Sequence, residues 1–225
     1  MIRVFIGYDP NEIVAWHVLT HSILKHSTSP ISFIPIAKNH IKDLYNKPKQ
    51  GYESTEFSMT RFLTPYLSDY RGWSIFLDCD MLVTSDITEL WDLRDDRYAV
   101  MCTKHDYTPS TSTKFLNQTQ SKYEKKNWSS VMMFNNAKCW KLTPKVVSSE
   151  SGMHLHQFKW LSSDDEIGSL PLNWNYLVGE EEPSREVPNL IHYTLGGPYF
   201  IDYRDVDYAE LWNLYYADMK NVNFK

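Results

Sequence analysis

Two aspartates separated by one residue are the feature of this sequence with the clearest chemical meaning. Asp78 and Asp80 follow the apolar run 73–77, which is typical of a buried strand. Because side chains alternate along an extended chain, both carboxylates are expected to face the same side. Two carboxylates about 4 Å apart repel each other by roughly 4 kcal/mol at an effective dielectric near 20. The pair therefore predicts a bound cation.

Oxygen ligands favour a hard divalent cation, Mg²⁺ or Mn²⁺. Such ions commonly take one or two carboxylates and complete their shell with water and the phosphates of a substrate. The sequence thus predicts a metal-bound diphosphate. An isolated Asp-x-Asp is equally typical of two aspartates that cap a strand-to-loop turn, so other parts of the chain must decide between these interpretations.

A second candidate lies near the end of the chain, where the segment 189–198 predicts a strand that runs into a glycine turn. His192 lies at the edge of this strand, ahead of Gly196 and Gly197. Glycines permit positive φ and leave backbone amides uncovered, which allows a phosphate to approach. An imidazole can complete a metal site begun by carboxylates, so we expect Asp78, Asp80 and His192 to form the metal shell. A histidine before a Gly-Gly turn is also often structural.

Composition limits the class of protein. The chain has 225 residues, of which 42% are hydrophobic and 23% are charged, as in a compact globular domain. The net charge of -5 and the absence of a lysine or arginine block argue against a nucleic acid polymer as partner. Three cysteines without paired spacing favour a reducing compartment. Without a signal peptide or a transmembrane run in this sequence, we expect a cytoplasmic protein, whose oligomeric state stays open.

The first third of the chain alternates strand and helix patterns, which predicts an α/β fold with a parallel sheet. Ligands gather at the carboxyl ends of the strands in such sheets, where Asp9 and Asp80 are expected. A helical stretch at 57–66, interrupted near Pro65, is expected to bring Arg61 toward the same edge. The expected elements in this part are strands at 4–6, 31–36 and 75–77 and helices at 12–25 and 41–45.

The pattern is less regular after Asp80, although the sheet is expected to continue. Strands are predicted at 98–101 and 130–134, a short helix at 87–93 and an amphipathic helix at 208–219 that packs on the core. The polar segment 104–127 shows no periodicity and predicts a long surface excursion. This excursion is either a substrate lid or a solvated connection without a role.

Several ordered motifs together resemble the retaining glycosyltransferases of family 8, the glycogenin-like and galactosyltransferase-like enzymes with the GT-A fold. The resemblance covers most of the chain. The motifs that carry it are Arg61-Phe62-Leu63-Thr64-Pro65-Tyr66-Leu67, Ile75-Phe76-Leu77-Asp78-Cys79-Asp80-Met81-Leu82-Val83 with Asp86-Ile87-Thr88-Glu89-Leu90, Asn127-Trp128-Ser129-Ser130-Val131-Met132-Met133-Phe134-Asn135, Ser163-Asp164-Asp165-Glu166-Ile167 and His192-Tyr193-Thr194-Leu195-Gly196-Gly197.

The resemblance implies a single GT-A domain with a Rossmann-like, mixed but mostly parallel central sheet flanked by helices. Residues 1–80 would form the nucleotide-binding half, and residues 81–225 the half that binds the acceptor and completes the metal site. The implied donor is a nucleotide-sugar, commonly a UDP-sugar, and the implied acceptor is a hydroxyl group. The resemblance also implies Mn²⁺, or Mg²⁺, bound by the Asp-x-Asp pair and the late histidine.

The resemblance assigns roles to further residues. Arg61 is expected to contact the donor sugar or diphosphate, and Gly7, Tyr8 and Asp9 the nucleoside. Tyr8 would stack on uracil, unless it is simply a buried tyrosine at a strand end.

Asp164 and Asp165 fall where the family carries acidic residues beside the anomeric carbon, so one of them is expected to be catalytic. Their structural alternative is the cap of a helix ahead of Glu166.

The sequence departs from the family pattern in two places. No lysine follows the glycine pair in Gly197-Pro198-Tyr199-Phe200, so the metal and backbone amides would neutralise more of the diphosphate charge, or lysines of 104–126 would replace the missing one. Asp165 stands where a glutamine is usual, which weakens any simple transfer of the catalytic role.

Two other functions fit parts of the pattern. A strand followed by Asp-x-Asp is also found in haloacid dehalogenase-like phosphatases, in which Asp78 would be the nucleophile. That motif normally opens its domain and carries Thr or Val two residues past the second aspartate, where this chain has Leu82. The other alternative, suggested by the missing lysine, is an inactive nucleotide-sugar-binding protein.

Overall fold

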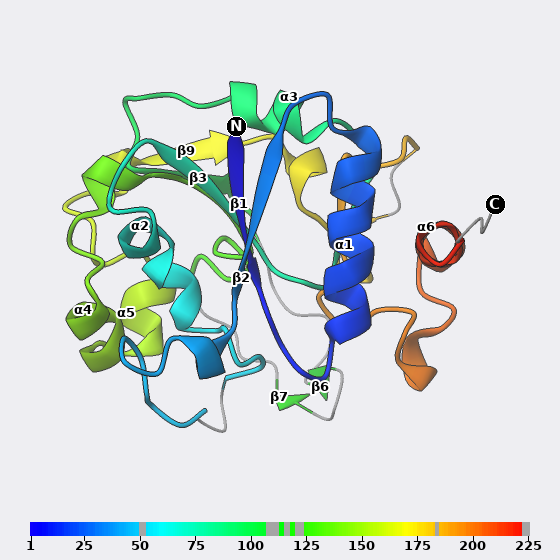
Figure 1. Cartoon of the computed structure of the whole chain (residues 1–225), viewed down its shortest axis with the longest axis horizontal. Helices are drawn as coiled ribbons and strands as arrows, with labels where there is room; N and C mark the ends of the chain where they lie inside the picture. The colour runs from blue at the N-terminus through cyan, green and yellow to red at the C-terminus, as the bar shows by residue number, and fades with distance from the viewer. Residues whose placement is uncertain (50–52, 107–112, 115–117, 120–123, 183–184, 222–225) are drawn as a thin grey trace.

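A mixed six-stranded sheet forms the centre of the molecule (Figure 1). The computed structural model describes residues 1–49, 53–106, 113–114, 118–119, 124–182 and 185–221. The strands of this sheet are β1 (Ile2–Gly7), β2 (Ile31–Ile36), β3 (Trp73–Leu77), β5 (Val100–Thr103), β8 (Val131–Asn135) and β9 (Ile167–Leu170). Their order is β2-β1-β3-β8-β5-β9, and only β8 runs against its neighbours. The predicted α/β class with a mostly parallel sheet is confirmed.

A second, smaller sheet contains the strand that follows Asp80 and the strand that ends at His192. It consists of β4 (Met81–Val83), β10 (Tyr176–Leu177) and β11 (Leu190–His192), in the order β10-β11-β4. β11 pairs antiparallel with β4, and His192 lies opposite Met81. Because β4 begins directly after Asp80, this register brings His192 beside the aspartate pair. A two-stranded ribbon of β6 (Thr113–Lys114) and β7 (Gln118–Thr119) lies apart from both sheets.

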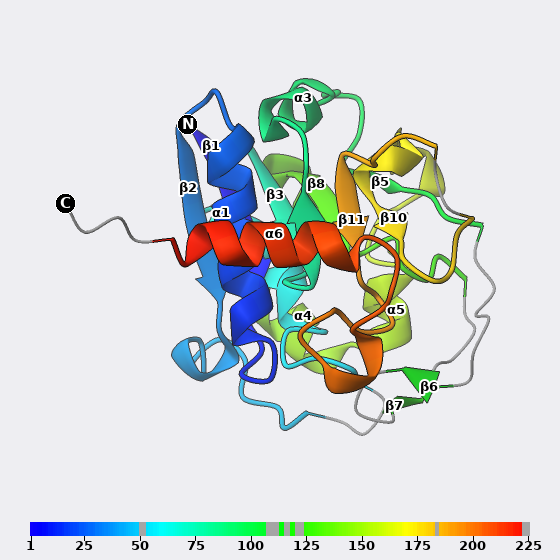
Figure 2. The ribbon, with the colours of Figure 1, turned by 90° about the vertical axis from the view of Figure 1, so that its right-hand side faces the viewer.

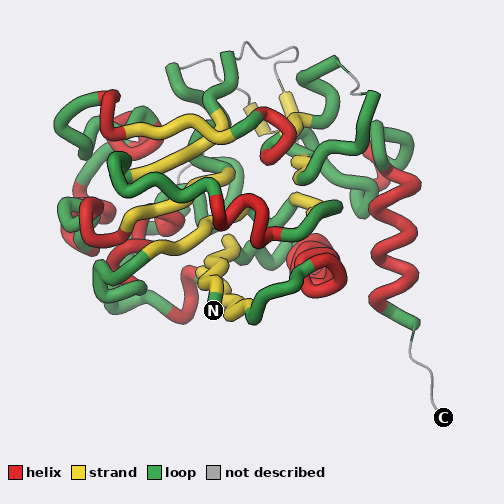
Figure 3. Tube along the Cα trace, turned by 90° about the horizontal axis from the view of Figure 1, so that it is seen from above, coloured by secondary structure: helices red, strands yellow, loops and turns green. Residues whose placement is uncertain are grey.

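Two long helices cover one side of the molecule. α1 (Ile13–His26) lies between the sheet and α6 (Ala209–Met219), which crosses it on the outside (Figures 2 and 3). α6 buries Trp212 and Tyr215 in a cluster with Val18 of α1 and Leu82 and Ile191 of the small sheet. The expected packing of the C-terminal helix on the core is therefore confirmed.

Short helices complete the fold, several of them on the other side of β1 in Figure 1. In the described part of the chain, no helix is long and apolar enough to cross a membrane. The α-helices are α2 (Thr64–Leu67), α3 (Ile87–Asp92), α4 (Pro144–Ser149) and α5 (Gly152–His156), and the 3-10 helices are Lys38–His40, Thr60–Leu63, Asn136–Cys139, Asp164–Glu166, Leu172–Trp174 and Ile201–Tyr203.

Several predicted boundaries are wrong, for local reasons. The expected helix at 41–45 is a single turn, in which Tyr45 N–H donates to the Ile41 carbonyl, because so short a segment forms too few hydrogen bonds to repay nucleation. Pro65 is the second residue of α2 and does not interrupt a helix, since a proline in the first turn lacks only an amide that would be unpaired there. The expected strands at 98–101 and 130–134 begin at Val100 and Val131, after turns that use the amides of Tyr98 and Ser130.

The expected division into a nucleotide-binding half and an acceptor half stays a prediction of function. Structurally, residues 1–80 and 81–225 each supply three strands of the same central sheet, so the domain is single. Much of the expected surface excursion at 104–127 lies outside the described residues, and so does its proposed role as a lid.

Gly7, at the end of β1, packs closely against Phe57 in the segment that leads to Arg61. A Cβ atom on Gly7 would lie 2.3 Å from Cδ2 of the buried Phe57 ring. We expect Gly7→Ala to lower the free energy of unfolding by about 1–3 kcal/mol, because the ring must shift within a filled core. Urea unfolding followed by circular dichroism measures this change. Gly152→Ala, at the first position of α5, is the control, and an equal free energy for Gly7→Ala and wild type would contradict the described packing.

Candidate active site

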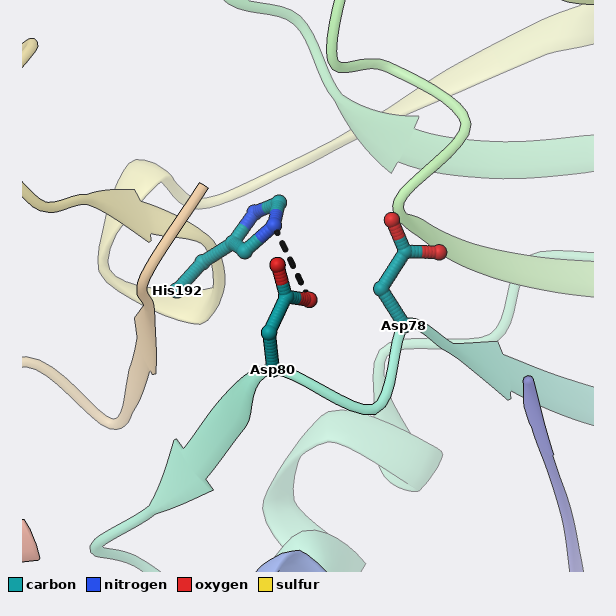
Figure 4. Close-up of side chains that lie close together, drawn as sticks. All are labelled: Asp78, Asp80 and His192. Carbon is teal, nitrogen blue, oxygen red and sulfur yellow. Dashed lines mark ion pairs between the residues drawn. The ribbon is translucent and has the colours of Figure 1, made fainter. Parts of the chain in front are cut away.

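Asp78 and Asp80 lie in the connection between β3 and β4, at the carboxyl edge of the large sheet. The Asp78 amide donates to the Ser130 carbonyl at 3.0 Å, and the Tyr193 amide donates to the Asp80 carbonyl at 2.9 Å. Both side chains are buried and project to the same side of the connection (Figure 4). The ligand atoms of Asp78, Asp80 and His192 all lie within 4.8 Å of one another. The structure therefore brings together the three residues that were expected to bind the metal.

Arg61 lies against this cluster, as the sequence predicts. Its Nη1 is 2.8 Å from Asp78 Oδ1 and donates to the Ser129 carbonyl at 2.9 Å, while Nε donates to the Ser58 carbonyl at 3.1 Å. With 5% of its surface exposed, Arg61 forms a desolvated ion pair with Asp78. Losing one partner of such a pair costs about 3–5 kcal/mol, because the other charge is left buried and uncompensated.

Four carboxylates converge on the Cys79 thiol, between the two aspartates. Burial raises the pKa of Cys79 well above its usual value, and the charges of Glu12, Asp80, Asp78 and Asp9 raise it further. Both effects favour the protonated thiol. The same four carboxylates are all less than 10% exposed. Arg61 pairs with Asp78, and the remaining negative charge favours a bound cation.

The segment that departs from the family pattern packs against α1. Tyr199 donates its hydroxyl proton to Glu12 Oε2 at 2.6 Å, and burial, with the nearby charge of Glu12, raises the pKa of Tyr199 well above its usual value. Tyr199 also fixes its neighbour, because a Cβ on Gly197 would lie 2.2 Å from the Tyr199 ring. Gly196 has a φ of 143°, and its amide donates to the Tyr193 carbonyl at 2.8 Å. Both glycines are thus required by packing, and the Gly196 amide is already used.

The expected nucleoside contacts lie at the end of β1. Asp9 is buried, and its Oδ1 accepts from the backbone amide and the side-chain amide of Asn11, both at 2.9 Å. Its Oδ2 accepts from the Glu56 amide at 3.0 Å. Asp9 therefore holds the β1–α1 connection to the segment that leads to Arg61. Tyr8 is half-buried beside it.

Asp164 and Asp165 lie elsewhere. They precede β9, whose first residue Ile167 pairs with Val100, whereas Asp78 follows the opposite end of its strand. Asp164 is largely exposed and forms an ion pair with Lys125 at 2.5 Å, and Ser163 and Glu166 form a capping box around the pair. Their contacts match the helix-cap alternative, and the structure does not bring them into the Asp78 cluster. Their catalytic role stays a prediction of the resemblance alone.

Two of the lysines that were considered as replacement charges contact β9 or the residues ahead of it. Lys104 Nζ donates to the Ile167 carbonyl at 2.7 Å, and Lys125 Nζ donates to the Gln157 carbonyl at 3.1 Å in addition to its ion pair. Neither contact points to the metal cluster, so a replacement role for these two lysines has no support in their hydrogen bonds.

Sequence reasoning missed a half-buried histidine near Arg61, which contacts the buried Ser129. His156 Nδ1 lies 2.7 Å from Ser129 Oγ, and burial, reinforced by the Arg61 charge, lowers the pKa of His156 to about 3. The histidine is therefore neutral over the physiological range. Its segment has no helical or strand period that marks it, and only a pair of histidines two residues apart, His154 and His156, singles it out.

These observations agree with the comparison of the chain with known families. Residues 4–152, more than half of the chain, match the family described as Glycosyl transferase family 8. The chain belongs to glycosyltransferase family 8. It is also 47% identical over 219 residues to the protein named Protein CDI of Arabidopsis thaliana, with 93% of this chain and 84% of that protein covered.

Solved structures share the fold of this family member. The chain superposes on galactosyltransferase LgtC, solved with donor and acceptor sugar analogs, with a TM-score of 0.63 at 13% identity, covering 99% of this chain and 98% of that one. GlyE of Streptococcus pneumoniae gives a TM-score of 0.63 at 16% identity, with 97% of this chain and 61% of GlyE covered. The chain spans half the length of the bifunctional glycosyltransferase WbbM.

Family membership and fold identify a GT-A glycosyltransferase and thus an enzyme that transfers a sugar to an acceptor. The phosphatase alternative is not supported, since the family match includes the Asp-x-Asp segment itself.

The low pKa of His156 gives a prediction for stability. Between pH about 6.5, the pKa of an unperturbed histidine, and about 3, the unfolded chain binds a proton at this residue that the folded chain does not. Stability should therefore fall as the pH falls through this window, by at most about 1.4 kcal/mol per pH unit from this group.

Replacement of His156 isolates this contribution. His156→Asn keeps an acceptor for Ser129 and should reduce the loss of unfolding free energy between pH 7 and 4 in urea titrations. His154→Asn, on the same helix, controls for the loss of a helix histidine. An unchanged pH dependence in His156→Asn would show that folding does not lower the pKa of His156.

Proposed function

We propose that this protein transfers a sugar, with retention of configuration, from a nucleotide-sugar to a hydroxyl acceptor in a reaction that needs Mn²⁺ or Mg²⁺. The observation that supports the proposal is the cluster of Asp78, Asp80 and His192, whose ligand atoms lie within 4.8 Å of one another. A UDP-sugar is the proposed donor, by analogy with the family.

The residues present fit a divalent ion. Asp80 Oδ1 lies 3.4 Å from His192 Nε2, which leaves room for an ion that both atoms coordinate after a small adjustment. Two carboxylates and an imidazole suit Mn²⁺, which accepts both oxygen and nitrogen ligands. Buried carboxylates with incomplete compensation are costly without a cation. When bound, the ion would supply positive charge that stabilises the departing diphosphate.

The residues of this chain then have distinct roles in the proposed reaction. The bond between the anomeric carbon and the diphosphate oxygen breaks, and its electron pair stays on the nucleoside diphosphate. The acceptor oxygen bonds to the anomeric carbon on the same face, and a phosphate oxygen takes the acceptor proton, although a covalent aspartyl-sugar intermediate is the rival route. Arg61, held by Ser58 and Ser129, orients Asp78 toward the donor.

The donor side is proposed from the positions of the remaining predicted residues. Asp9 and Tyr8 lie at the carboxyl end of β1, where nucleotides bind in sheets of this kind. Gly196 and Gly197 follow the candidate metal ligand His192 by four and five residues, and we propose on the resemblance that this turn lies beside the diphosphate. Asp164 and Asp165 precede β9 and are not part of the Asp78 cluster, so only the resemblance supports our proposal that they are catalytic. The substitutions Asp164→Asn and Asp165→Asn test this role directly.

A screen of sugar nucleotides tests the donor. Each nucleotide-sugar is added with and without Mn²⁺, and the unfolding temperature is recorded. Because a ligand that binds the folded state stabilises it by mass action, the correct donor should raise this temperature by an amount that grows with ligand concentration and needs the metal. Release of nucleoside diphosphate from the same donor distinguishes transfer or hydrolysis from the alternative of an inactive binding protein. Equal stabilisation with EDTA in place of Mn²⁺ would contradict the metal dependence.

Substitution of the metal ligands ranks their contributions. Asp80→Asn removes a charged ligand, and His192→Ala removes a neutral one, so we expect Asp80→Asn to weaken metal-dependent donor cleavage more. Replacement of a residue that merely supports a metal ligand typically lowers metal affinity or activity about 10–100-fold. Replacement of a ligand itself should therefore lower metal-dependent cleavage by at least that factor.

Donor cleavage is measured as nucleoside diphosphate release over a range of Mn²⁺ concentrations. Asp43→Asn, at an exposed aspartate, is the control. Full metal-dependent cleavage by Asp80→Asn would exclude the proposed shell, and equal losses in the two variants would show that the ligands are ranked wrongly.

A further inference from the structure

Asn175 is buried directly behind the candidate metal ligand His192. It follows the 3-10 helix Leu172–Trp174, precedes β10 and has 0% of its surface exposed. Its Oδ1 atom lies 3.0 Å from His192 Nδ1, on the side of the imidazole that faces away from Asp80. No sequence motif points to this asparagine.

Hydrogen bonds on the other side of Asn175 fix which end of its amide faces the histidine. Nδ2 lies 2.9 Å from Ser130 Oγ and 3.4 Å from the Asn127 carbonyl oxygen. The carbonyl can only accept. Ser130 gives its own proton to the same carbonyl at 2.6 Å, so its lone pairs are left to accept from Asn175. Both partners require a donor, and the amide nitrogen must therefore face them while the oxygen faces His192.

The orientation of the amide determines the tautomer of His192. An amide oxygen only accepts, so His192 Nδ1 must carry the proton and donate it to Asn175 Oδ1. In the neutral imidazole, Nε2 then carries a free lone pair. Nε2 is the atom that lies 3.4 Å from Asp80 Oδ1, on the side of the aspartate pair.

The opposite tautomer would otherwise be favoured before a metal binds. The Asp80 carboxylate accepts hydrogen bonds and attracts a proton to Nε2, where it would block coordination. Asn175 competes with Asp80 for the single proton of the neutral ring. A metal-binding histidine commonly gives its second N–H to a partner that fixes the ring in this way.

We propose that Asn175 is a positioning residue that holds His192 in the Nδ1–H tautomer, so that Nε2 is ready to bind the divalent cation before the cation arrives. The proposal rests on the proposed function, since it assumes that His192 is a metal ligand. The tautomer itself is a property of the metal-free chain and is tested separately.

The chain offers a matched control. Asn136 is equally buried, and its Nδ2 also donates to one serine hydroxyl, Ser74 Oγ at 2.9 Å, and one carbonyl, that of Arg71 at 3.1 Å. Asn136 follows β8, whereas Ser130 precedes it, so the two asparagines lie at opposite ends of this strand. Replacing Asn136 therefore removes a similar hydrogen-bond set far from His192.

Calorimetric titration with Mn²⁺ alone measures the effect on affinity. We expect Asn175→Leu to weaken Mn²⁺ binding 10–100-fold, the range typical of partners of metal ligands. Asn136→Leu should lower thermal stability without changing the affinity. Asn175→Asp keeps an acceptor oxygen toward Nδ1 and should restore most of the affinity lost in Asn175→Leu. Wild-type affinity in Asn175→Leu would overturn the proposal.

Nitrogen NMR of the metal-free protein, labelled with ¹⁵N-histidine, reads the tautomer directly. The wild type should show His192 protonated at Nδ1, and Asn175→Leu should shift the proton toward Nε2. Protonation at Nε2 in the wild type would overturn the proposal, even if the variant fails to fold. Weak Mn²⁺ binding by an Asn175→Leu protein that keeps the Nδ1–H tautomer would also overturn it. A wild type with the expected tautomer that binds no divalent ion would contradict the proposed function instead.

Discussion

The antiparallel pairing of β4 with β11 is the constraint on which the site depends. The two strands lie more than 100 residues apart in the sequence, and their register places His192 opposite Met81, the residue after Asp80. A slip by one residue would turn the imidazole to the other face of the small sheet. Burial of Leu82 and Ile191 beneath α6 opposes such a slip, because these neighbours would exchange the apolar cluster for a polar face. The C-terminal helix thus helps to position the candidate metal ligands through this packing.

The four buried carboxylates near Cys79 are contacted by side chains from several parts of the fold, because buried negative charges need compensating groups. Asp9, Glu12, Asp78 and Asp80 are all buried near Cys79. Asn11 donates to Asp9, Tyr199 donates to Glu12 and Arg61 pairs with Asp78, while His192 Nε2 lies 3.4 Å from Asp80. Tyr199 and His192 come from segments that are more than 100 residues from their carboxylates. Charges collected in this way cost stability, and the cost is consistent with a site whose charges are completed by a ligand.

The sequence was sufficient to predict the elements and candidate ligands that have a clear local pattern. β1, α1 and β2 alternate with clear periods, and Asp78 and Asp80 are close in sequence, so their common direction follows from strand geometry. Arg61 was expected at the same edge because a parallel sheet collects its loops there. His192 required more, since its value as a ligand depends on a pairing between remote strands. The glycine turn after His192 and the cation that the aspartate pair calls for suggested that role, and the resemblance to a family agreed with it.

Other features could not be predicted because they depend on tertiary contacts. Asp164 and Asp165 match the family pattern by order along the chain, but their place relative to Asp78 depends on the parallel register of β9 with β5, which no local pattern fixes. Their catalytic role stays a prediction. Asn175 matches no motif, and its importance is visible only in its hydrogen bonds.

The segment before β8 explains how these remote parts are coordinated. The Ser129 carbonyl accepts from Arg61, the Ser130 carbonyl accepts from the Asp78 amide, and the Ser130 hydroxyl accepts from Asn175, which holds His192. Asn127 starts this segment with a φ of 64°, a left-handed conformation that asparagine tolerates better than most residues. A single backbone turn therefore sets the positions of the arginine, the first aspartate and the histidine together. Any distortion of that turn should disturb all three at once, so the geometry of the site is a property of this segment as much as of the ligands themselves.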